Sequence, residues 1–214
     1  QNLLLRFVPE EALGGLYEAL LEAGLALPEA HTLLDITRCP GADTCNLAIT
    51  RSRGLAQALE AHLSALPLAQ DPGAKAIGVK ISGCPNSCGQ HHIADIGFYG
   101  SSRKVGEREV PHYVLLLGGR TREGEARFGQ VVGRIPARRV PEAVERILKR
   151  YLEERQNGES FQAYLDRVGA ASFKPLLQDL QEVPPYEEAP EFYQDLGAEG
   201  EAFSVQLGRG ERAV

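Results

Sequence analysis

Apolar runs along the chain predict four β-strands. Residues 75–82 alternate, with isoleucine and valine side chains on one face, and residues 93–99 are predicted as the next strand. Residues 110–117 form a third, strongly apolar strand, and a short apolar run at 2–7 predicts one more at the beginning of the chain.

Apolar residues at helical spacing predict four helices. The first begins at Pro9, because proline suits the first turn and the two glutamates after it stabilise the positive end of the helix dipole. The others are predicted over residues 46–66, 136–155 and 161–168. The run V-P-P-Y-E-E-A-P at 183–190 excludes regular structure, so the end of the chain is expected to form an extended arm along the surface.

Length and composition are those of an ordinary globular protein. The chain has 214 residues, a formal net charge of −6, 43% hydrophobic and 24% charged residues, which suits one domain plus a part, or two small ones. No apolar run approaches the roughly 20 residues of a membrane helix and no signal-like segment opens the chain, so we expect a cytoplasmic protein with no membrane partner. The chain begins at Gln1 and contains no methionine, which predicts a piece of a longer polypeptide.

Charge is distributed unevenly along the chain. Residues 101–155 carry 13 basic and eight acidic side chains, whereas residues 170–214 carry three basic and nine acidic ones. This distribution would suit nucleic acid, an acidic protein partner, or a tail folded back on its own domain. The arginine-rich stretches lack interleaved aromatic residues, which argues against nucleic acid.

All the cysteines lie in two short segments, T-R-C-P-G-A-D-T-C at 37–45 and S-G-C-P-N-S-C-G at 82–89. Their pattern is C-x5-C, 38 intervening residues and C-x3-C, which favours a metal site over disulfides. Zinc pairs normally enclose about two to four residues, so the longer interval favours a [4Fe–4S] cluster, whose sulfides accept hydrogen bonds from backbone amides. Gly41, Gly83 and Gly89 would allow that close approach. A zinc site and free buried thiols remain as alternatives.

Two further pairs of side chains lie beside the cysteines. His91 and His92 follow the second segment, and we interpret them as histidines satisfied at the mouth of a strand rather than as metal ligands or proton donors. Arg51 and Arg53 follow the first segment on the predicted helix. They could bind carboxylates of a cofactor, although solvated arginines on a helix surface are the more common case.

The ordered combination of these motifs resembles a known family. An opening Q-N-L-L, C-P-G-A-D-T-C-N-L-A-I-T-R-S-R-G, the 38-residue gap and G-C-P-N-S-C-G are similar to the C-terminal half of siroheme- and [4Fe–4S]-dependent nitrite and sulfite reductases. The resemblance implies an α+β fold: the second half of a ferredoxin-like domain at 1–30, a mixed-sheet catalytic domain with flanking helices at 31–169, and an extended acidic arm at 170–214. Members of the family reduce nitrite to ammonia or sulfite to sulfide with six electrons.

The resemblance also implies roles for residues of this chain. The cluster would be held by Cys39, Cys45, Cys84 and Cys88. Cys88 would bridge the cluster to the siroheme iron, and Asn86 would donate a hydrogen bond that tunes the cluster. Arg51 and Arg53 are the candidates for the siroheme carboxylates.

The side chains that bind the substrate anion lie in the N-terminal half of the family, so we expect no catalytic residue in this chain and no activity from it alone. Expected partners are that N-terminal half of the same protein, a ferredoxin-like electron donor and a small anion, nitrite or sulfite. The alternative is an iron–sulfur electron-transfer or binding module without siroheme.

An acidic donor would suit a basic docking face near the cluster. Its candidate residues are Arg103, Arg120, Arg122, Arg134, Arg138 and Arg139. The same arginines could instead pair with the acidic tail at 170–214.

Overall fold

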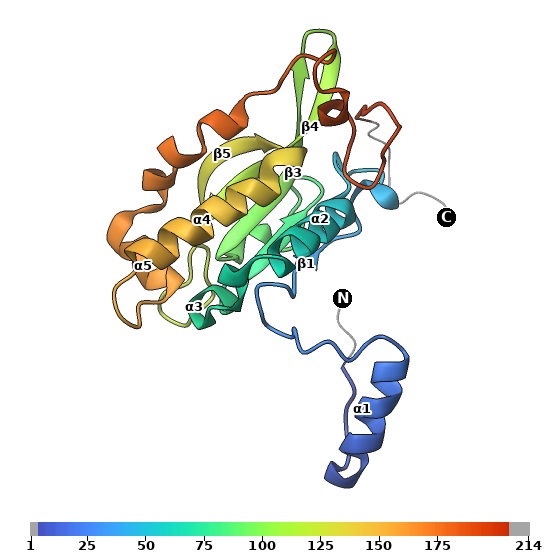
Figure 1. The fold of residues 1–214 in the computed structure, drawn as a ribbon, viewed down its shortest axis with the longest axis vertical. Helices are drawn as coiled ribbons and strands as arrows, with labels where there is room; N and C mark the ends of the chain where they lie inside the picture. Colours follow the sequence, from blue (N-terminus) through green and yellow to red (C-terminus); the bar gives the residue numbers. More distant parts are fainter. Residues whose placement is uncertain (1–3, 206–214) are drawn as a thin grey trace.

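A mixed five-stranded sheet organises the computed structural model, which describes residues 4–205 (Figure 1). The strands lie side by side in chain order: β1 (Thr37–Arg38), β2 (Val79–Ser82), β3 (Ile96–Val105), β4 (Arg108–Leu117) and β5 (Gln130–Pro136). The first three strands run parallel, whereas β3, β4 and β5 form an antiparallel meander. With its flanking helices this is the predicted α+β fold.

Two helices, α2 (Ser52–Ser64) and α4 (Val140–Glu154), cover one face of the sheet (Figure 1). Alternate strand residues point toward them, because successive side chains of a strand lie on opposite faces. Leu55 and Leu59 of α2 and Phe98 of β3 belong to this core and are fully buried. The shorter helices α3 (Pro72–Lys75) and α5 (Phe161–Val168) lie at one end of the helical layer (Figure 1).

Two predicted elements match closely, and one begins late for a local reason. The helix predicted at 161–168 has its predicted bounds, and β4 extends the predicted strand by two residues at its start. The strand predicted from residue 75 begins only at Val79. Asp71 and Pro72 start α3 before it, since the Asp71 carboxylate accepts the first free N–H groups of that helix.

The starts of three other predicted elements are corrected by local structure. The strand predicted at 93–99 begins at Ile96 and continues to Val105, because a 3₁₀ turn, η4 (His91–Ile93), precedes it. The helix predicted at 46–66 begins at Ser52, since the N–H groups of the residues before it bond to another loop. The helix predicted at 136–155 begins with a 3₁₀ turn, η5 (Ala137–Arg139), and continues as α4.

The strand predicted at 2–7 is absent from the described part of that range, residues 4–7, and residues 1–3 lie outside it. Leu4 and Phe7 are 78% and 90% exposed. A strand needs a neighbouring strand to pair its N–H and C=O groups, and this segment lies away from the sheet (Figure 1). The helix predicted after Pro9 is confirmed as a 3₁₀ turn, η1 (Glu10–Ala12), and α1 (Leu13–Glu22), none of whose residues is buried.

The chain after α5 runs along the β5 side of the sheet and returns beside α2 (Figure 1). Up to residue 205 it contains four 3₁₀ turns: η6 (Ala170–Phe173), η7 (Pro175–Leu177), η8 (Asp179–Gln181) and η9 (Pro190–Tyr193). Phe173, Leu177 and Leu180 extend the hydrophobic core. Residues 183–189 have no helix or strand, as their prolines predict, whereas Pro190, the last residue of that run, begins η9. The arm expected to be extended along the surface thus forms 3₁₀ turns and core contacts within the described residues.

Candidate functional site

The two cysteine segments meet at one edge of the sheet. Cys39 directly follows β1, and Cys84 lies two residues after β2. Because β1 and β2 are parallel neighbours, their carboxyl ends lie together. The Cys39 N–H donates to the Ile81 carbonyl at 3.2 Å, which continues the pairing into the loops.

Backbone hydrogen bonds lock these two loops to each other. The Gly83 carbonyl accepts the N–H groups of Ile49 at 2.8 Å and Thr50 at 3.0 Å. In the reverse direction, the Gly83 N–H donates to the Cys39 sulfur at 3.2 Å. The first loop therefore cannot move without displacing the backbone that carries Cys84.

Glycines make this close approach of the two loops possible. A Cβ on Gly83 would lie 2.6 Å from the Thr50 carbonyl oxygen and 2.8 Å from the Gly41 Cα. Gly41 also has a φ of +63°, a conformation that side chains disfavour. A Cβ on Gly89 would overlap the Ile81 carbonyl oxygen.

The four cysteines are free thiols with a graded exposure. Cys39 and Cys84 are buried, Cys45 is half-buried and Cys88 is exposed. Burial is the main cause that raises the pKa of Cys84, and the other three cysteines raise it further by charge. The Asn86 backbone N–H opposes this by donating to Cys84 and lowering its pKa. The other three cysteines thus lie near enough to act on Cys84 electrostatically.

This donor set fits an iron–sulfur cluster. Thiolates are the ligands that such clusters take, and backbone N–H groups directed at sulfur stabilise their negative charge. The N–H groups of Gly83 and Asn86 are directed at Cys39 and Cys84 in this way. Across residues 4–205, no three His, Cys, Asp or Glu side chains are grouped to hold a single metal ion.

The turn that carries Cys88 contains strained backbone. Ser87 and Gln90 each have a φ of 62°, a left-handed conformation that costs an ordinary residue about 1 to 2 kcal/mol. The turn is closed by the Gln90 N–H, which donates to the Ser87 carbonyl at 2.8 Å. The Gly89 N–H donates to the Ser82 hydroxyl at 3.0 Å, which ties the turn to the end of β2.

His91 is fully buried beside this turn and is satisfied at one ring nitrogen. Its Nδ1 lies 2.8 Å from the Ser82 hydroxyl, whereas its Nε2 has no hydrogen-bond partner within the described residues. Burial lowers the pKa of His91 to about 4, so the ring is neutral. The ring packs against His92 and Tyr99, with centroids 4.1 and 4.9 Å away. The expectation of a satisfied histidine is therefore met only in part.

Arg51 and Arg53 lie in different surroundings. Arg51 donates from Nη1 to the Gly197 carbonyl at 2.9 Å and forms ion pairs with Asp43 at 3.7 Å and Glu201 at 3.5 Å. Its guanidinium is thus engaged with the end of the chain. Arg53 is exposed on the first turn of α2.

Asp195 is a buried carboxylate beside the first cysteine loop that sequence reasoning missed. Its two oxygens accept the N–H groups of Arg51 at 2.6 Å and Leu196 at 2.9 Å. It is 4% exposed, and burial raises its pKa to about 6. The next residue packs so closely on α2 that a Cβ on Gly54 would overlap the Leu196 carbonyl. No local pattern marks this contact, because its partners lie 144 residues apart.

We expect Asp195 to make the protein more stable as the pH falls from about 6 to 4. Its folded-state pKa lies above the ordinary value, so the folded state binds the proton first and acid relieves the burial penalty, by about 3 kcal/mol at most. Asp195→Asn should remove this contribution. Urea unfolding of both proteins between pH 4 and 7 measures it.

Asp179→Asn is the matched control. Arg146 lowers the pKa of Asp179, so its charge stabilises the fold at neutral pH and this contribution is lost in acid. The two variants should therefore shift the pH dependence in opposite directions. Parallel curves for the wild type and Asp195→Asn would contradict the assignment.

The arginines proposed as a docking face divide between solvent, α5 and the tail. Arg138 donates to the Glu191 carbonyl at 3.1 Å, and Arg139 donates to the Asp179 carbonyl at 2.8 Å. Arg120 pairs with Asp166 of α5 at 2.8 Å. The remaining candidates, Arg103, Arg122 and Arg134, are exposed. Arg138 and Arg139 therefore bind the tail at 170–214, which is the alternative to a docking face for these two arginines.

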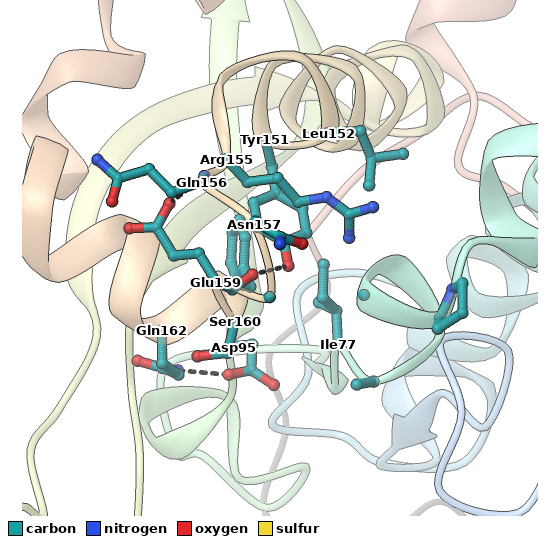
Figure 2. A pocket seen from close by; sticks show the side chains of 15 residues that line it. Ile77, Asp95, Tyr151, Leu152, Arg155, Gln156, Asn157, Glu159, Ser160 and Gln162 are labelled. Carbon is teal, nitrogen blue, oxygen red and sulfur yellow. Dashed lines mark hydrogen bonds between the residues drawn. The ribbon is translucent and has the colours of Figure 1, made fainter.

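A cavity of about 530 Å³ lies where β2 and β3 begin, whereas the cysteine loops follow the ends of β1 and β2. Figure 2 shows the side chains that line it. Asp95, just before β3, accepts the Gly78 N–H at 2.7 Å and a hydrogen bond from the Gln162 amide. Arg155 forms a two-pronged ion pair with Asp71, with both distances 2.8 Å. The Gln162 amide nitrogen is thus satisfied, whereas its buried Oε1 has no hydrogen-bond partner within the described residues. The residues that line the cavity include no cysteine or histidine.

No helix within residues 4–205 is long and apolar enough to cross a membrane. The family model for the nitrite and sulphite reductase 4Fe-4S domain matches residues 29–183. That range contains both cysteine loops and the whole sheet.

Similar proteins carry the names of reductases. Sulfite reductase [ferredoxin] 1 of Mycolicibacterium paratuberculosis is 29% identical over 172 residues, covering 78% of this chain and 31% of that protein. The sulfite reductase [NADPH] hemoprotein beta-component of Chromohalobacter salexigens is 31% identical over 170 residues, covering 79% and 28%. The chain thus spans about a third of the length of these relatives.

A solved structure has the same fold. The NirA protein of Mycobacterium tuberculosis superposes with a TM-score of 0.63 at 26% identity, covering 76% of this chain and 30% of that one. The family model, the two cysteine loops and the fold shared with the NirA protein all indicate the same family. The chain belongs to the nitrite and sulphite reductase 4Fe-4S domain family.

Proposed function

We propose that this chain is the cluster-bearing C-terminal part of an assimilatory nitrite or sulfite reductase. Cys39, Cys45, Cys84 and Cys88 hold a [4Fe–4S] cluster, and siroheme binds beside it. The observation that carries the proposal is the pair of interlocked loops, which join the cysteine segments through Gly83 and direct backbone N–H groups at sulfur.

Cys88 is the residue best suited to bridge the cluster and the siroheme iron. It is the exposed member of the set, so its sulfur is accessible to a second group, whereas Cys39 and Cys84 are buried. Siroheme, when bound, supplies the iron at which the anion is reduced by six electrons. This chain's part is to fix the thiolates and to exclude water from the two buried ones.

Asn86 and Arg53 have supporting roles. The Asn86 N–H donates to Cys84 and stabilises its thiolate. Arg53 is exposed on α2 and available to a siroheme carboxylate, whereas the Arg51 guanidinium is held by Gly197 and Glu201 and serves to bind the tail.

The other partners lie outside this chain. The chain covers about a third of its relatives' length, so we assign anion binding to the N-terminal half of the same protein and expect this chain alone to be inactive. The substrate is a small anion, nitrite or sulfite. Electrons come from a ferredoxin-like protein donor, as the name of one relative indicates for that relative.

Metal analysis and visible spectroscopy of the complete protein, prepared without oxygen, test this proposal. We expect about four non-siroheme irons per chain, intense Soret and α bands from siroheme, and turnover of nitrite or sulfite. A broad shoulder without these bands would favour an iron–sulfur module without siroheme. Zinc in place of iron would overturn the cluster assignment.

A further inference from the structure

Ser82 connects three elements of the candidate site. It is the last residue of β2, is 1% exposed, and precedes Cys84 by two residues. Its hydroxyl accepts the Gly89 N–H and also meets His91 Nδ1. One hydroxyl therefore joins the strand before Cys84 to the residue after Cys88 and to the buried histidine.

The Ser82 hydroxyl has one proton to donate, and His91 provides the acceptor. An O–H group donates one hydrogen bond and accepts up to two. Since Gly89 is a donor, the acceptor that the described residues provide for the Ser82 proton is His91 Nδ1, at 2.8 Å. A Ser82 hydroxyl oriented by His91 presents its lone pair to Gly89.

His91 is itself held rigidly in place. Its ring lies against His92 and Tyr99, and its backbone carbonyl touches β3 so closely that a Cβ on Gly97 would overlap it. The side chain is therefore a fixed support, and not a mobile surface group.

Packing alone does not account for an imidazole at this position. The site is fully buried and flanked by rings, surroundings that phenylalanine would fill without leaving Nε2 unpaired. What histidine adds is the hydrogen bond that its Nδ1 accepts from the Ser82 hydroxyl. That bond acts on the turn where Ser87 and Gln90 hold strained backbone on both sides of Cys88.

We infer that His91 is a positioning residue: through Ser82 it holds the Gly89 N–H and thereby fixes the strained turn that presents the Cys88 thiolate. This inference rests on the proposed function, because it takes Cys88 as a ligand of the cluster.

The test compares four variants of the complete, cofactor-loaded protein. His91→Phe keeps a ring and removes both nitrogens, and Ser82→Ala removes the hydroxyl. His91→Asn restores a polar group near the place of Nδ1. His92→Phe is the matched control, because His92 belongs to the same group of stacked rings.

The readouts are the electron paramagnetic resonance spectrum of the reduced cluster, the rate of iron loss to a chelator, and hydrogen exchange of the peptide around Gly89. We expect His91→Phe and Ser82→Ala to alter the spectrum, to lose iron about tenfold faster, as substitutions of residues that orient metal ligands do, and to lose protection at Gly89. His91→Asn should restore much of each property, and His92→Phe should resemble the wild type.

Each unfavourable result has a distinct meaning. A wild-type protein without an iron–sulfur cluster would overturn the proposed function. A loaded wild type with an unchanged His91→Phe variant would overturn this inference alone. An Asn variant no better than the Phe variant would also overturn it, because the Nδ1 bond would then have no role. If His91→Phe fails to fold, Ser82→Ala and His91→Asn still decide the question.

Discussion

Cys84→Ser is expected to remove the iron–sulfur cluster from the complete protein while leaving the fold intact. Serine has nearly the same shape, but its hydroxyl is a poor ligand for iron in a cluster, which is held by soft thiolates. Cys84 is buried and accepts the Asn86 N–H. We therefore expect no external thiol to enter this position and replace it as a ligand. We expect iron content to fall at least about tenfold.

Iron analysis and the visible spectrum measure this loss, and the iron-free forms provide the control. Without metal, the free energies of unfolding of Cys84→Ser and the wild type should differ by no more than about 2 kcal/mol, because the smaller, buried hydroxyl can accept the Asn86 N–H that Cys84 accepts. A variant that still binds four irons per chain would show that Cys84 is not a ligand.

Gly89→Ala is expected to destabilise the protein by about 3 to 5 kcal/mol, which is among the largest effects of a single substitution. The new Cβ would overlap the carbonyl oxygen of Ile81, a backbone atom inside β2 that cannot rotate away. Either the strand or the Cys88 turn must move, and the Ser82 to Gly89 hydrogen bond would be lost with it. Urea unfolding of the purified chain measures the loss.

Gly133→Ala in β5 is the matched control for this effect. Its Cβ would come no closer than 3.3 Å to the flexible Gln181 side chain, which can move aside. We expect a change in unfolding free energy below about 1 kcal/mol. Equal losses in the two variants would mean that the steric argument at Gly89 is wrong.

Local patterns predicted β4 and α5, because residues 110–117 carry a mostly apolar run and residues 161–168 carry a helical period. Residues 4–7 carry a similar apolar run and form no strand, because a strand also requires a neighbour that the pattern does not reveal. Two strands show no alternation of apolar and polar residues that could be detected in the sequence. β1 has only two residues, and β5 contains Gly133 and pairs with β4 across a shift in register.

The candidate site divides in the same way. The sequence was enough to single out the cysteines, the glycines beside them and the two adjacent histidines as candidates, because the members of each group lie within a few residues of one another. The hydrogen-bond partners that hold these groups in place could not be predicted from the sequence. The bond from His91 to Ser82 crosses nine residues and two elements, and Asp195 reaches Arg51 from the opposite end of the chain. Contacts of this kind depend on the register of β2 and on the path of the tail.

The separation of Arg51 and Asp195 also sets an order of events during synthesis. A ribosome adds about 5 to 20 residues per second, so the 144 residues between them take about 7 to 30 s to make. Throughout that interval the nascent chain contains both residues of the first cysteine pair but not the carboxylate that receives the Arg51 N–H. A factor that delivers iron and sulfide during synthesis therefore meets the first cysteine loop before the segment around Asp195 has been made. A factor that acts after release from the ribosome meets that loop with the segment already present.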